Sequence, residues 1–387
     1  MPKKKAMTPM PPGWSATGSW DFGPLAATTQ GPISWPSGPF GLGTNLAGFA
    51  DDNAIDHLYS PPYAIPAGAS ARLTFDSWMC ADVGYGGGAG CGAVGQVAMA
   101  VATGVSKVGV VWRSRKRGDP TKRVWAKVGG RVLDHWKWSR PSGLLRPVDE
   151  VAMLWRRYMH EYGATREQLA NVAIAVRKHA NLNPRSAMYE RTMDLDDYMN
   201  ARWISEPLCL FDNCLESDGA VALVIVGAQR AKDCPHKPAY IHAWSQGLPM
   251  QYQLMTDYHS EDPLLGASVV TARNLWRQSD FGPDDVDVAQ IYDAFSPLIP
   301  FTLEAFGFCG RGEGAAFGQD GAWEPGGRLP INTSGGSLSE AYIHGMNLVT
   351  EGVRQIRGTS TSQVEGAEVS LVTSAYVVPN GAVLLRS

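Results

Sequence analysis

The sequence predicts an α/β protein in which helices and strands alternate over most of the chain. Two segments with apolar residues at helical spacing follow one another between residues 147 and 179. Short apolar runs of strand length recur from residue 108 to the C-terminus, and glycine-rich turns separate them. A chain of 387 residues is long enough for two domains, or for one large duplicated domain with a sizeable core.

Composition and charge indicate an ordinary soluble enzyme. The chain is 44% hydrophobic and 18% charged, and its net charge of −3 gives no argument for nucleic acid or membrane binding. No run of 18 apolar residues occurs, and residues 1–5 do not lead into the apolar region of a secretory signal. We therefore expect no membrane span and a cytoplasmic location.

Residues 1–70 show no sustained helical or strand periodicity, and several prolines interrupt them. From residue 85 the pattern is clearer. A glycine run at 86–88 leads into a helix of small apolar residues, Ala93 to Ala102, and a strand follows from Val108 to Trp112. Small side chains let a helix approach its neighbours closely, so we expect this helix to be buried between layers.

The segment from Arg113 to Arg140 contains ten Lys or Arg residues against two Asp. Such a segment can bind the phosphates of a CoA-like substrate, or it can be a solvated loop. Both interpretations stay open.

The next elements have clear start and stop signals. Pro147 begins one helix that ends before Gly163, and a capping box at 165–168 begins a second helix that runs to about His179. A continuous apolar run from Ala220 to Val226 predicts a strand of a buried sheet. Another strand, Val286 to Ile291, places Tyr292 at its carboxyl end, where open α/β sheets place their chemistry.

The C-terminal part contains a second glycine pair, Gly335-Gly336, which opens a helix-like segment. The chain then ends in a predicted hairpin, with strands at 369–378 and 382–385 around a turn at Pro379-Asn380-Gly381. The six cysteines have no metal-ligand spacing, so we expect reduced thiols and no metal site.

Several blocks of the chain resemble the lipid-transfer-protein branch of the thiolase superfamily, which includes the thiolase domain of sterol carrier protein X. Within that branch, the similarity is greatest to the bacterial steroid side-chain aldolases. The blocks keep their order and lie at 85–89 (YGGGA), 157–163 (RYMHEYG), 206–212 (EPLCLFD), 217–219 (SDG), 290–295 (QIYDAF), 307–314 (GFCGRGEG) and 332–345 (NTSGGSLSEAYIHG). Many members of the superfamily place one active-site histidine in each of two of these blocks, where this chain has Tyr292 and Tyr342.

The resemblance implies a thiolase fold, in which five layers (α-β-α-β-α) are built from two similar halves. It divides the chain into a divergent N-terminal part at 1–84, the remainder of the N-terminal half with a loop insertion at 85–240, and the C-terminal half at 241–387. It places the nucleophilic cysteine of a thiolase near Gly87, with Cys91 about one turn too late, and no cysteine follows Cys309. Acyl transfer through an acyl-enzyme is therefore disfavoured.

The two tyrosines suit a different reaction, the retro-aldol cleavage of a β-hydroxyacyl-CoA. One phenol would take the hydroxyl proton and the other would protonate the α-carbon, while the thioester accepts the electrons, so no cofactor is required beyond the CoA of the substrate. We expect Tyr292 and Tyr342 to be the acid/base pair, with Asp293 and His344 as tuning groups. Which tyrosine is the base stays open.

Backbone N–H groups at the glycine turns, Gly87-Gly88 and Gly335-Gly336, are candidate donors to the enolate oxygen. By resemblance, the substrate would be a steroid acyl-CoA of the 17-hydroxy-C22 type, cleaved to a 17-keto steroid and propionyl-CoA. The resemblance also implies a homodimer and a small OB-fold/zinc-ribbon partner in an α2β2 complex. The alternatives are a thiolase-type acyltransferase that uses Cys91, and a non-catalytic protein that binds lipid or acyl-CoA.

Overall fold

The computed structural model describes residues 89–118, 136–248, 262–374 and 380–387, together with four short strands nearer the N-terminus. The chain divides into two compact units, residues 1–81 and 82–387. In the first unit, β1 (Ser15–Ala16) pairs with β4 (Leu58–Tyr59), and β2 (Trp20–Gly23) pairs with β3 (Gly41–Thr44), both antiparallel. The glycines at 87 and 88 lie outside the described residues, and the expected division at 240/241 stays a prediction.

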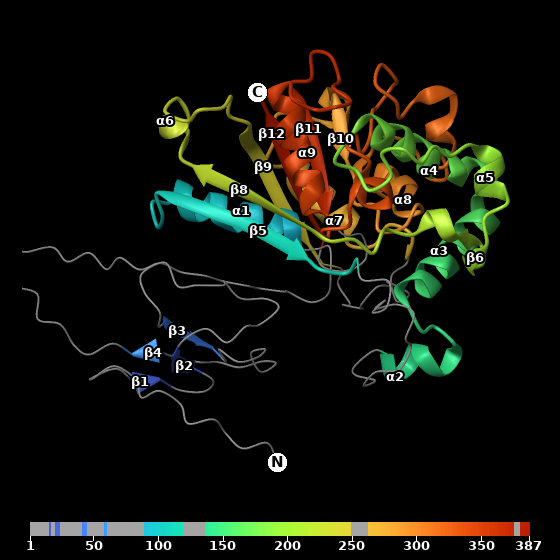
Figure 1. Cartoon of the computed structure of the whole chain (residues 1–387), viewed down its shortest axis with the longest axis horizontal. Helices are drawn as coiled ribbons and strands as arrows, with labels where there is room; N and C mark the ends of the chain where they lie inside the picture. Colours follow the sequence, from blue (N-terminus) through green and yellow to red (C-terminus); the bar gives the residue numbers. More distant parts are fainter. Residues whose placement is uncertain are drawn as a thin grey trace, which may run out of the picture. The chain divides into compact units, whose positions relative to one another are not determined.

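The second unit alternates helices and strands, as the sequence predicts (Figure 1). Its helices are α1 (Ala89–Ala102), α2 (Trp136–Ser139), α3 (Pro147–Tyr162), α4 (Arg166–Leu182), α5 (Leu195–Met199), α6 (Ala228–Ala231), α7 (Ser268–Trp276), α8 (Leu298–Phe306) and α9 (Met346–Arg357). Its strands are β5 (Val108–Arg115), β6 (Trp203–Ser205), β7 (Leu208–Cys209), β8 (Gly219–Val226), β9 (Tyr240–Gly247), β10 (Val288–Gln290), β11 (Val369–Ser374) and β12 (Asn380–Arg386).

A four-stranded sheet forms the centre of this unit, with the strand order β10-β11-β12-β9. Strands β10 and β11 are parallel, and the other two pairs are antiparallel. The predicted antiparallel pairing of the two C-terminal strands is confirmed, because β11 pairs with β12 from Val369↔Arg386 to Ser374↔Gly381. The turn expected at 379–381 is misplaced, since Asn380 and Gly381 belong to β12, and residues 375–379 lie outside the described ranges. A separate antiparallel pair, β5 with β8, contacts α1, and α9 also contacts β8.

Helices α1 and α9 lie between the two sheets, and α7 covers the other face of the four-stranded sheet (Figure 1). The alternation along β9 shows this arrangement. A Cβ added to Gly92 or Gly95 of α1 would overlap Gln246 or Trp244, whereas Ser245 donates a hydrogen bond to Thr271 O of α7 at 2.8 Å. The described residues thus form successive layers of strand, helix, strand and helix.

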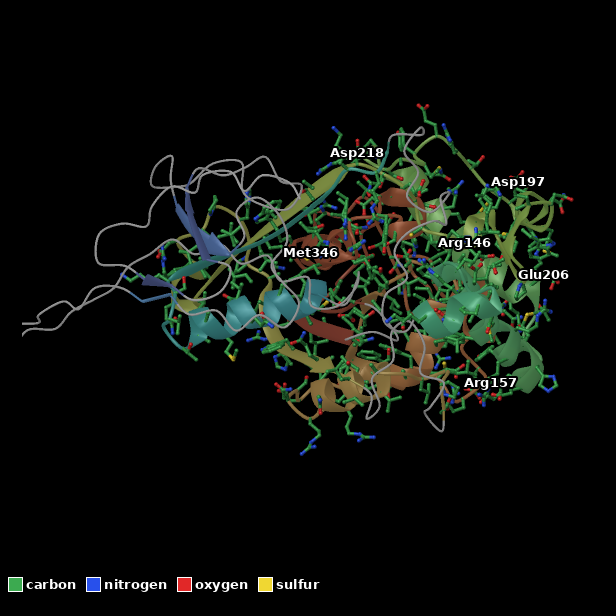
Figure 2. The ribbon with its side chains drawn as sticks, turned by 90° about the horizontal axis from the view of Figure 1, so that it is seen from below. Arg146, Arg157, Asp197, Glu206, Asp218 and Met346 are labelled. Carbon is green, nitrogen blue, oxygen red and sulfur yellow. The ribbon has the colours of Figure 1, made fainter. Side chains whose placement is uncertain are left out.

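The prediction that α1 is a close-packed helix of small residues is confirmed, although the helix begins at Ala89 rather than Ala93. A side chain at Gly95 would lie 2.0 Å from the Trp244 ring, so only glycine allows this approach. The two central helices also meet at their N-termini, where a Cβ on Gly90 would lie 3.4 Å from Met346 Sδ (Figure 2).

The predicted helix start signals are confirmed. Pro147 is the first residue of α3, and the Thr165 hydroxyl accepts from Gln168 N while the Gln168 side chain accepts from Thr165 N. Two other expectations are wrong. Alternate residues of β8 are exposed and the others are only half-buried, so this strand is covered on one face and only in part. After Gly336 the chain forms a single π-helical turn to Glu340 and a break, and α9 begins only at Met346.

None of the helices within the described ranges is long and apolar enough to cross a membrane.

Candidate active site

Tyr292 follows the carboxyl end of β10, the central-sheet strand that ends at Gln290. The segment is held from the side by Asn332. Its Oδ1 accepts from Ile291 N at 2.7 Å, and its Nδ2 donates to Ile291 O at 2.8 Å. The backbone N–H of Tyr292 donates to Thr373 Oγ1 of β11 at 3.2 Å. The backbone that carries Tyr292 is therefore fixed on both sides.

Tyr342 lies in the loop that joins the π-helical turn Gly336–Glu340 to α9. The backbone of this loop is unusual, since His344 has φ of 49° and Gly345 has φ of 77°. Tyr342 N donates to Ser217 Oγ at 2.9 Å. A Cβ on Gly345 would lie 2.9 Å from the Tyr292 ring, so the loop passes directly over that ring.

The two predicted tyrosines meet, and their hydroxyl oxygens are 2.7 Å apart. The rings are tilted by 48° with centroids 6.4 Å apart, and both side chains are buried. Burial raises the pKa of each phenol above its ordinary value, and the nearby Cys214 thiol raises both further. The hydrogen bond from Tyr342 and the charge of Arg113 act in the opposite direction on the pKa of Tyr292. The pair can therefore share or pass one proton.

Asp293 is fully buried and holds the Tyr342 loop from below. Its Oδ1 accepts from Ser337 N at 2.7 Å, and its Oδ2 accepts from Leu338 N at 3.3 Å. Burial raises the pKa of Asp293 to about 6, although these N–H donors lower it. The carboxylate thus couples the segment after Tyr292 to the loop before Tyr342.

His344 contacts the other side of Tyr342, with ring centroids 4.8 Å apart. Its Nδ1 lies 2.6 Å from a guanidinium nitrogen of Arg113 and also contacts Arg115. A guanidinium can only donate, so Nδ1 is the acceptor and the ring proton is on Nε2. The two arginines are two positions apart on β5, and they bring cationic charge next to the tyrosine pair.

Several backbone N–H groups around the Gly335-Gly336 turn, which holds candidate oxyanion donors, are bonded within the protein. The Gly335 N–H donates to Asn332 O at 2.9 Å, and the next two N–H groups after Gly336 are held by Asp293, so this turn uses these donors internally. The Gly335 N–H is thus already bonded within its own turn, and a role for Gly335 or Gly336 toward an enolate stays a prediction. Only glycine fits at position 336, because its φ is 56° and a Cβ there would lie 2.1 Å from Asp293 Oδ2.

Cys91 is the third residue of α1 and is completely buried. Its backbone N–H donates to Ser374 Oγ at 3.3 Å, and its thiol lies 3.6 Å from Val372 O. Burial raises the pKa of Cys91 to about 12. A thiol with this pKa is not a nucleophile at neutral pH.

Sequence reasoning missed the part played by the segment 213–217, which lies between the two tyrosine-bearing segments. Cys214 N donates to Ala294 O at 2.9 Å, Leu215 N donates to Ser337 O at 3.0 Å, and Ser217 holds Tyr342 N. The next residue, Asp218, accepts from Arg117 N at 2.7 Å and so joins the ends of β5 and β8 (Figure 2). A signal for the β5 side of the site was available in Arg113 and Arg115, because alternate residues of a strand lie on one face.

Within the described ranges, no group of three His, Cys, Asp or Glu side chains could hold a metal ion.

Comparisons with known proteins point to one family. Residues 253–383 match the family described as thiolase C-terminal domain-like. A steroid side-chain-cleaving aldolase of Thermomonospora curvata is 46% identical over 78% of this chain and 79% of its own length. A 17-hydroxy-3-oxo-4-pregnene-20-carboxyl-CoA lyase of Mycobacterium tuberculosis is 45% identical over 82% of this chain and 83% of its own length.

Solved structures give the same result. An Ltp2–ChsH2(DUF35) aldolase superposes with a TM-score of 0.73 at 45% identity and covers 79% of each chain. A monomeric SCP2-thiolase-like protein type 1 from Mycobacterium smegmatis superposes with a TM-score of 0.54 at 16% identity, covering 78% of this chain and 61% of its own, which is a likeness of fold. The resemblance identified in the sequence and the thiolase fold it implies are thus confirmed. The chain belongs to the thiolase superfamily, in the group that contains the steroid side-chain aldolases.

Proposed function

We propose that this protein is a carbon–carbon lyase that cleaves a steroid side-chain β-hydroxyacyl-CoA by a retro-aldol reaction. The substrate is of the 17-hydroxy-C22 type, and the products are a 17-keto steroid and propionyl-CoA. The observation that carries the proposal is the hydrogen-bonded pair of Tyr292 and Tyr342, buried where other thiolase-like proteins have histidines. The curated relatives that cleave steroid side chains support the substrate class.

The reaction needs two proton transfers around one bond cleavage. A base removes the proton of the tertiary hydroxyl, the oxygen becomes a ketone, and the bond to the α-carbon breaks. Its electron pair enters the thioester as an enolate, and an acid then protonates the α-carbon. Since the thioester carbonyl accepts the electrons, the proposal includes no cofactor.

One phenol of the pair acts as the base and the other as the acid. Burial raises the pKa of both phenols, and the charge of Arg113 acts against this at Tyr292 as that of Arg117 does at Tyr342, so the two roles are assigned to the pair as a unit. After one turnover the proton sits on the wrong oxygen, and the 2.7 Å hydrogen bond offers a direct path for it to return.

Partners are part of the proposal. The solved relative is described as an Ltp2–ChsH2(DUF35) aldolase, which supports a complex with a small partner of that kind. We propose a homodimer of this chain that binds two such partners, each an OB-fold with a zinc ribbon. Arginines 113, 115 and 117 belong to the basic segment 113–140, whose remaining role is proposed to be contact with the CoA moiety.

The test is product analysis on a 17-hydroxy-C22 steroid CoA ester. The chain is purified alone and together with a candidate DUF35 partner, and the 17-keto steroid and propionyl-CoA are quantified by chromatography and mass spectrometry. Equimolar formation of the two products supports the lyase. Binding of the ester without either product, with every partner tried, would overturn the proposal in favour of a non-catalytic binding protein.

A further inference from the structure

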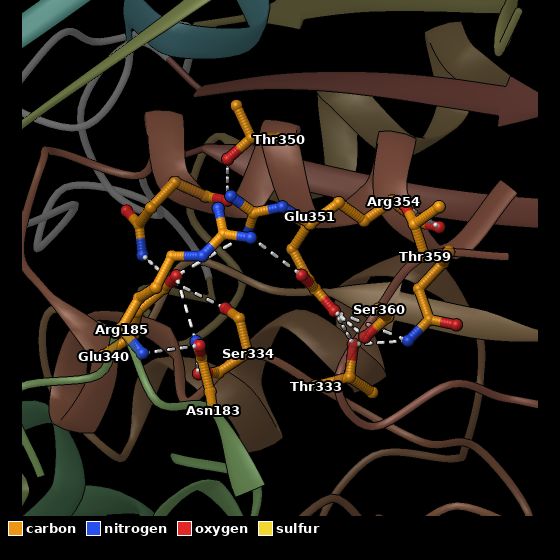
Figure 3. A network of polar contacts seen from close by, with 12 residues as sticks. Asn183, Arg185, Thr333, Ser334, Glu340, Thr350, Glu351, Arg354, Thr359 and Ser360 are labelled. Atoms are coloured by element: carbon orange, nitrogen blue, oxygen red, sulfur yellow. Dashed lines mark hydrogen bonds and ion pairs between the residues drawn. The ribbon is translucent and has the colours of Figure 1, made fainter. Parts of the chain in front are cut away.

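Glu340 is a buried carboxylate next to the site that the proposed mechanism does not use. Its side chain is enclosed by donors from three parts of the chain (Figure 3). Oε2 accepts from Ser334 Oγ at 2.6 Å and from Asn347 Nδ2 at 3.1 Å. Oε1 lies 3.4 Å from Asn183 Nδ2 and 3.7 Å from Arg354 Nη1. One carboxylate thus joins the start of the Tyr342 loop, its end at α9 and the segment after α4.

The backbone of Glu340 is tied as firmly as its side chain. Its N–H donates to Gly335 O at 2.9 Å, and its carbonyl accepts from Ala187 N at 2.9 Å. Ser186 Oγ donates to the neighbouring Ser339 O at 2.7 Å. These contacts fix the residue two positions before Tyr342 against the layer formed by α4 and its following turn.

The loop needs such ties because its own backbone preferences do not hold it. A π-helical turn is rare, and positive φ values at Asn332 and His344 are uncommon for residues other than glycine. Each such residue is estimated to cost about 1–3 kcal/mol unless the surroundings compensate for it. A buried carboxylate is itself costly, and burial raises the pKa of Glu340 above its ordinary value. Burying the Glu340 carboxylate costs free energy, and several donors surround it. We therefore attribute its presence to the loop conformation that it holds in place.

We propose that Glu340 is a positioning residue that holds the Tyr342 hydroxyl in place against the Tyr292 hydroxyl. This inference rests on the proposed function, because the position matters only if the two phenols exchange protons. Asp293 fixes the loop from the Tyr292 side through Ser337 N, and Glu340 fixes it from the opposite side. If the Glu340 contacts are lost, Asp293 still holds the loop, but the Tyr342 side chain can shift away from Tyr292.

The expected size follows from the geometry of proton transfer. A displacement of about 1 Å at a reacting group costs on the order of 100-fold in rate. Truncating Glu340 should therefore lower kcat by about 100-fold while the KM for the ester changes less than about twofold, because the loss is in alignment and not in uniform substrate binding.

The experiment compares Glu340→Ala with Glu340→Gln and with a control at another buried carboxylate. Among the described atoms, Asn347 Oδ1 has no hydrogen-bond partner, so a glutamine amide can be satisfied if the Asn347 amide turns over. Glu340→Gln should therefore recover most of the activity lost in Glu340→Ala. The control is Glu304→Gln, since Glu304 accepts from Tyr158 Oη, Arg311 and Gly314 N, away from the Tyr342 loop. It should lower the melting temperature without changing kcat.

A second readout does not depend on turnover. Near-ultraviolet circular dichroism reports the surroundings of buried tyrosines, and the difference between a protein and its Tyr342→Phe variant gives the signal of Tyr342. This difference should weaken in the Glu340→Ala background and stay unchanged in Glu304→Gln. Equal kcat in wild type and Glu340→Ala, or an unchanged Tyr342 signal, would overturn the role of Glu340. A wild type that releases no product would instead count against the proposed function, and the spectra alone would then decide on Glu340.

Discussion

Asp293 and Gly336 lie so close together that no side chain fits between them, since a Cβ on Gly336 would be 2.1 Å from Asp293 Oδ2. This contact joins the segment of one tyrosine of the hydrogen-bonded pair to the loop of the other. Asp293 directly follows Tyr292, and Gly336 begins the turn that leads to Tyr342. The distance between the two phenols is therefore set by the contact of the Asp293 carboxylate with the Gly336 backbone, as well as by their own hydrogen bond.

Replacing Gly336 by alanine should separate the two segments. The added methyl group overlaps a buried carboxylate and also requires φ of 56°, so we expect kcat to fall by at least about 100-fold and the melting temperature to decrease. The matched control is Gly358→Ala. Gly358 also has a positive φ, of 73°, but no atom lies within 4 Å of the place that an added methyl group would take, so this variant should cost about 1 kcal/mol of stability and leave kcat unchanged. Equal kcat values for the two variants would contradict this account.

Removing either phenol hydroxyl should stop the chemistry and preserve the fold. Tyr292→Phe and Tyr342→Phe each remove one proton-transfer group, so kcat should fall by about 100- to 10,000-fold, with product formation as the measurement. Each variant leaves the other hydroxyl without its 2.7 Å partner, so a small change in melting temperature is expected. Tyr158→Phe is the control, because Tyr158 is an equally buried tyrosine bonded to Glu304. Near-normal cleavage by Tyr292→Phe or Tyr342→Phe would remove that residue from the mechanism.

The pKa of Asp293 predicts how stability depends on pH. The folded-state pKa of about 6 is above the ordinary value of 3.8, so the folded protein holds this proton more tightly than the unfolded chain. The contribution of Asp293 to the free energy of unfolding is therefore fully present below pH 3.8 and is lost as the pH rises through 6. A pKa difference of about 2 corresponds to about 3 kcal/mol.

Asp293→Asn should remove this dependence. Between pH 4 and 7, the stability of wild type relative to the variant should fall by up to about 3 kcal/mol, measured by denaturant unfolding at each pH. At neutral pH the variant should be less active, because an amide oxygen can replace only one carboxylate oxygen opposite Ser337 N and Leu338 N. Asp287→Asn is the activity control, since Asp287 also accepts from two successive N–H groups, those of Glu368 and Val369. A stability difference that does not change with pH would refute the raised pKa.

The sequence was sufficient for the elements whose signals are local, and it indicated the two tyrosines whose hydroxyls the structure brings together. Pro147 and the 165–168 capping box act within one turn, so the starts of α3 and α4 could be predicted. The hydrogen bonds that position the two phenols could not be predicted, because they join residues that are far apart in the sequence and follow no periodic pattern. Ser217 lies 125 positions from Tyr342, and Arg113 lies 231 positions from His344. The exposed face of β8 was missed because an apolar run does not show which of its faces is covered.

Cys91 provides the last prediction, which separates the lyase from a thiolase-type acyltransferase. Because Cys91 is fully buried and its pKa is raised to about 12, native protein at about pH 7.5 should not be alkylated there by iodoacetamide. Cys91→Ala should keep kcat and lose about 1–2 kcal/mol of stability through the small cavity left in the core. The exposed Cys234 should react first and shows that the reagent is active.

Peptide mapping must also follow Cys214, because this thiol lies close enough to the tyrosine pair to raise both phenol pKa values. Inactivation that follows labelling of Cys214 is compatible with the lyase, whereas inactivation that follows labelling of Cys91, together with loss of activity in Cys91→Ala, would favour the acyltransferase.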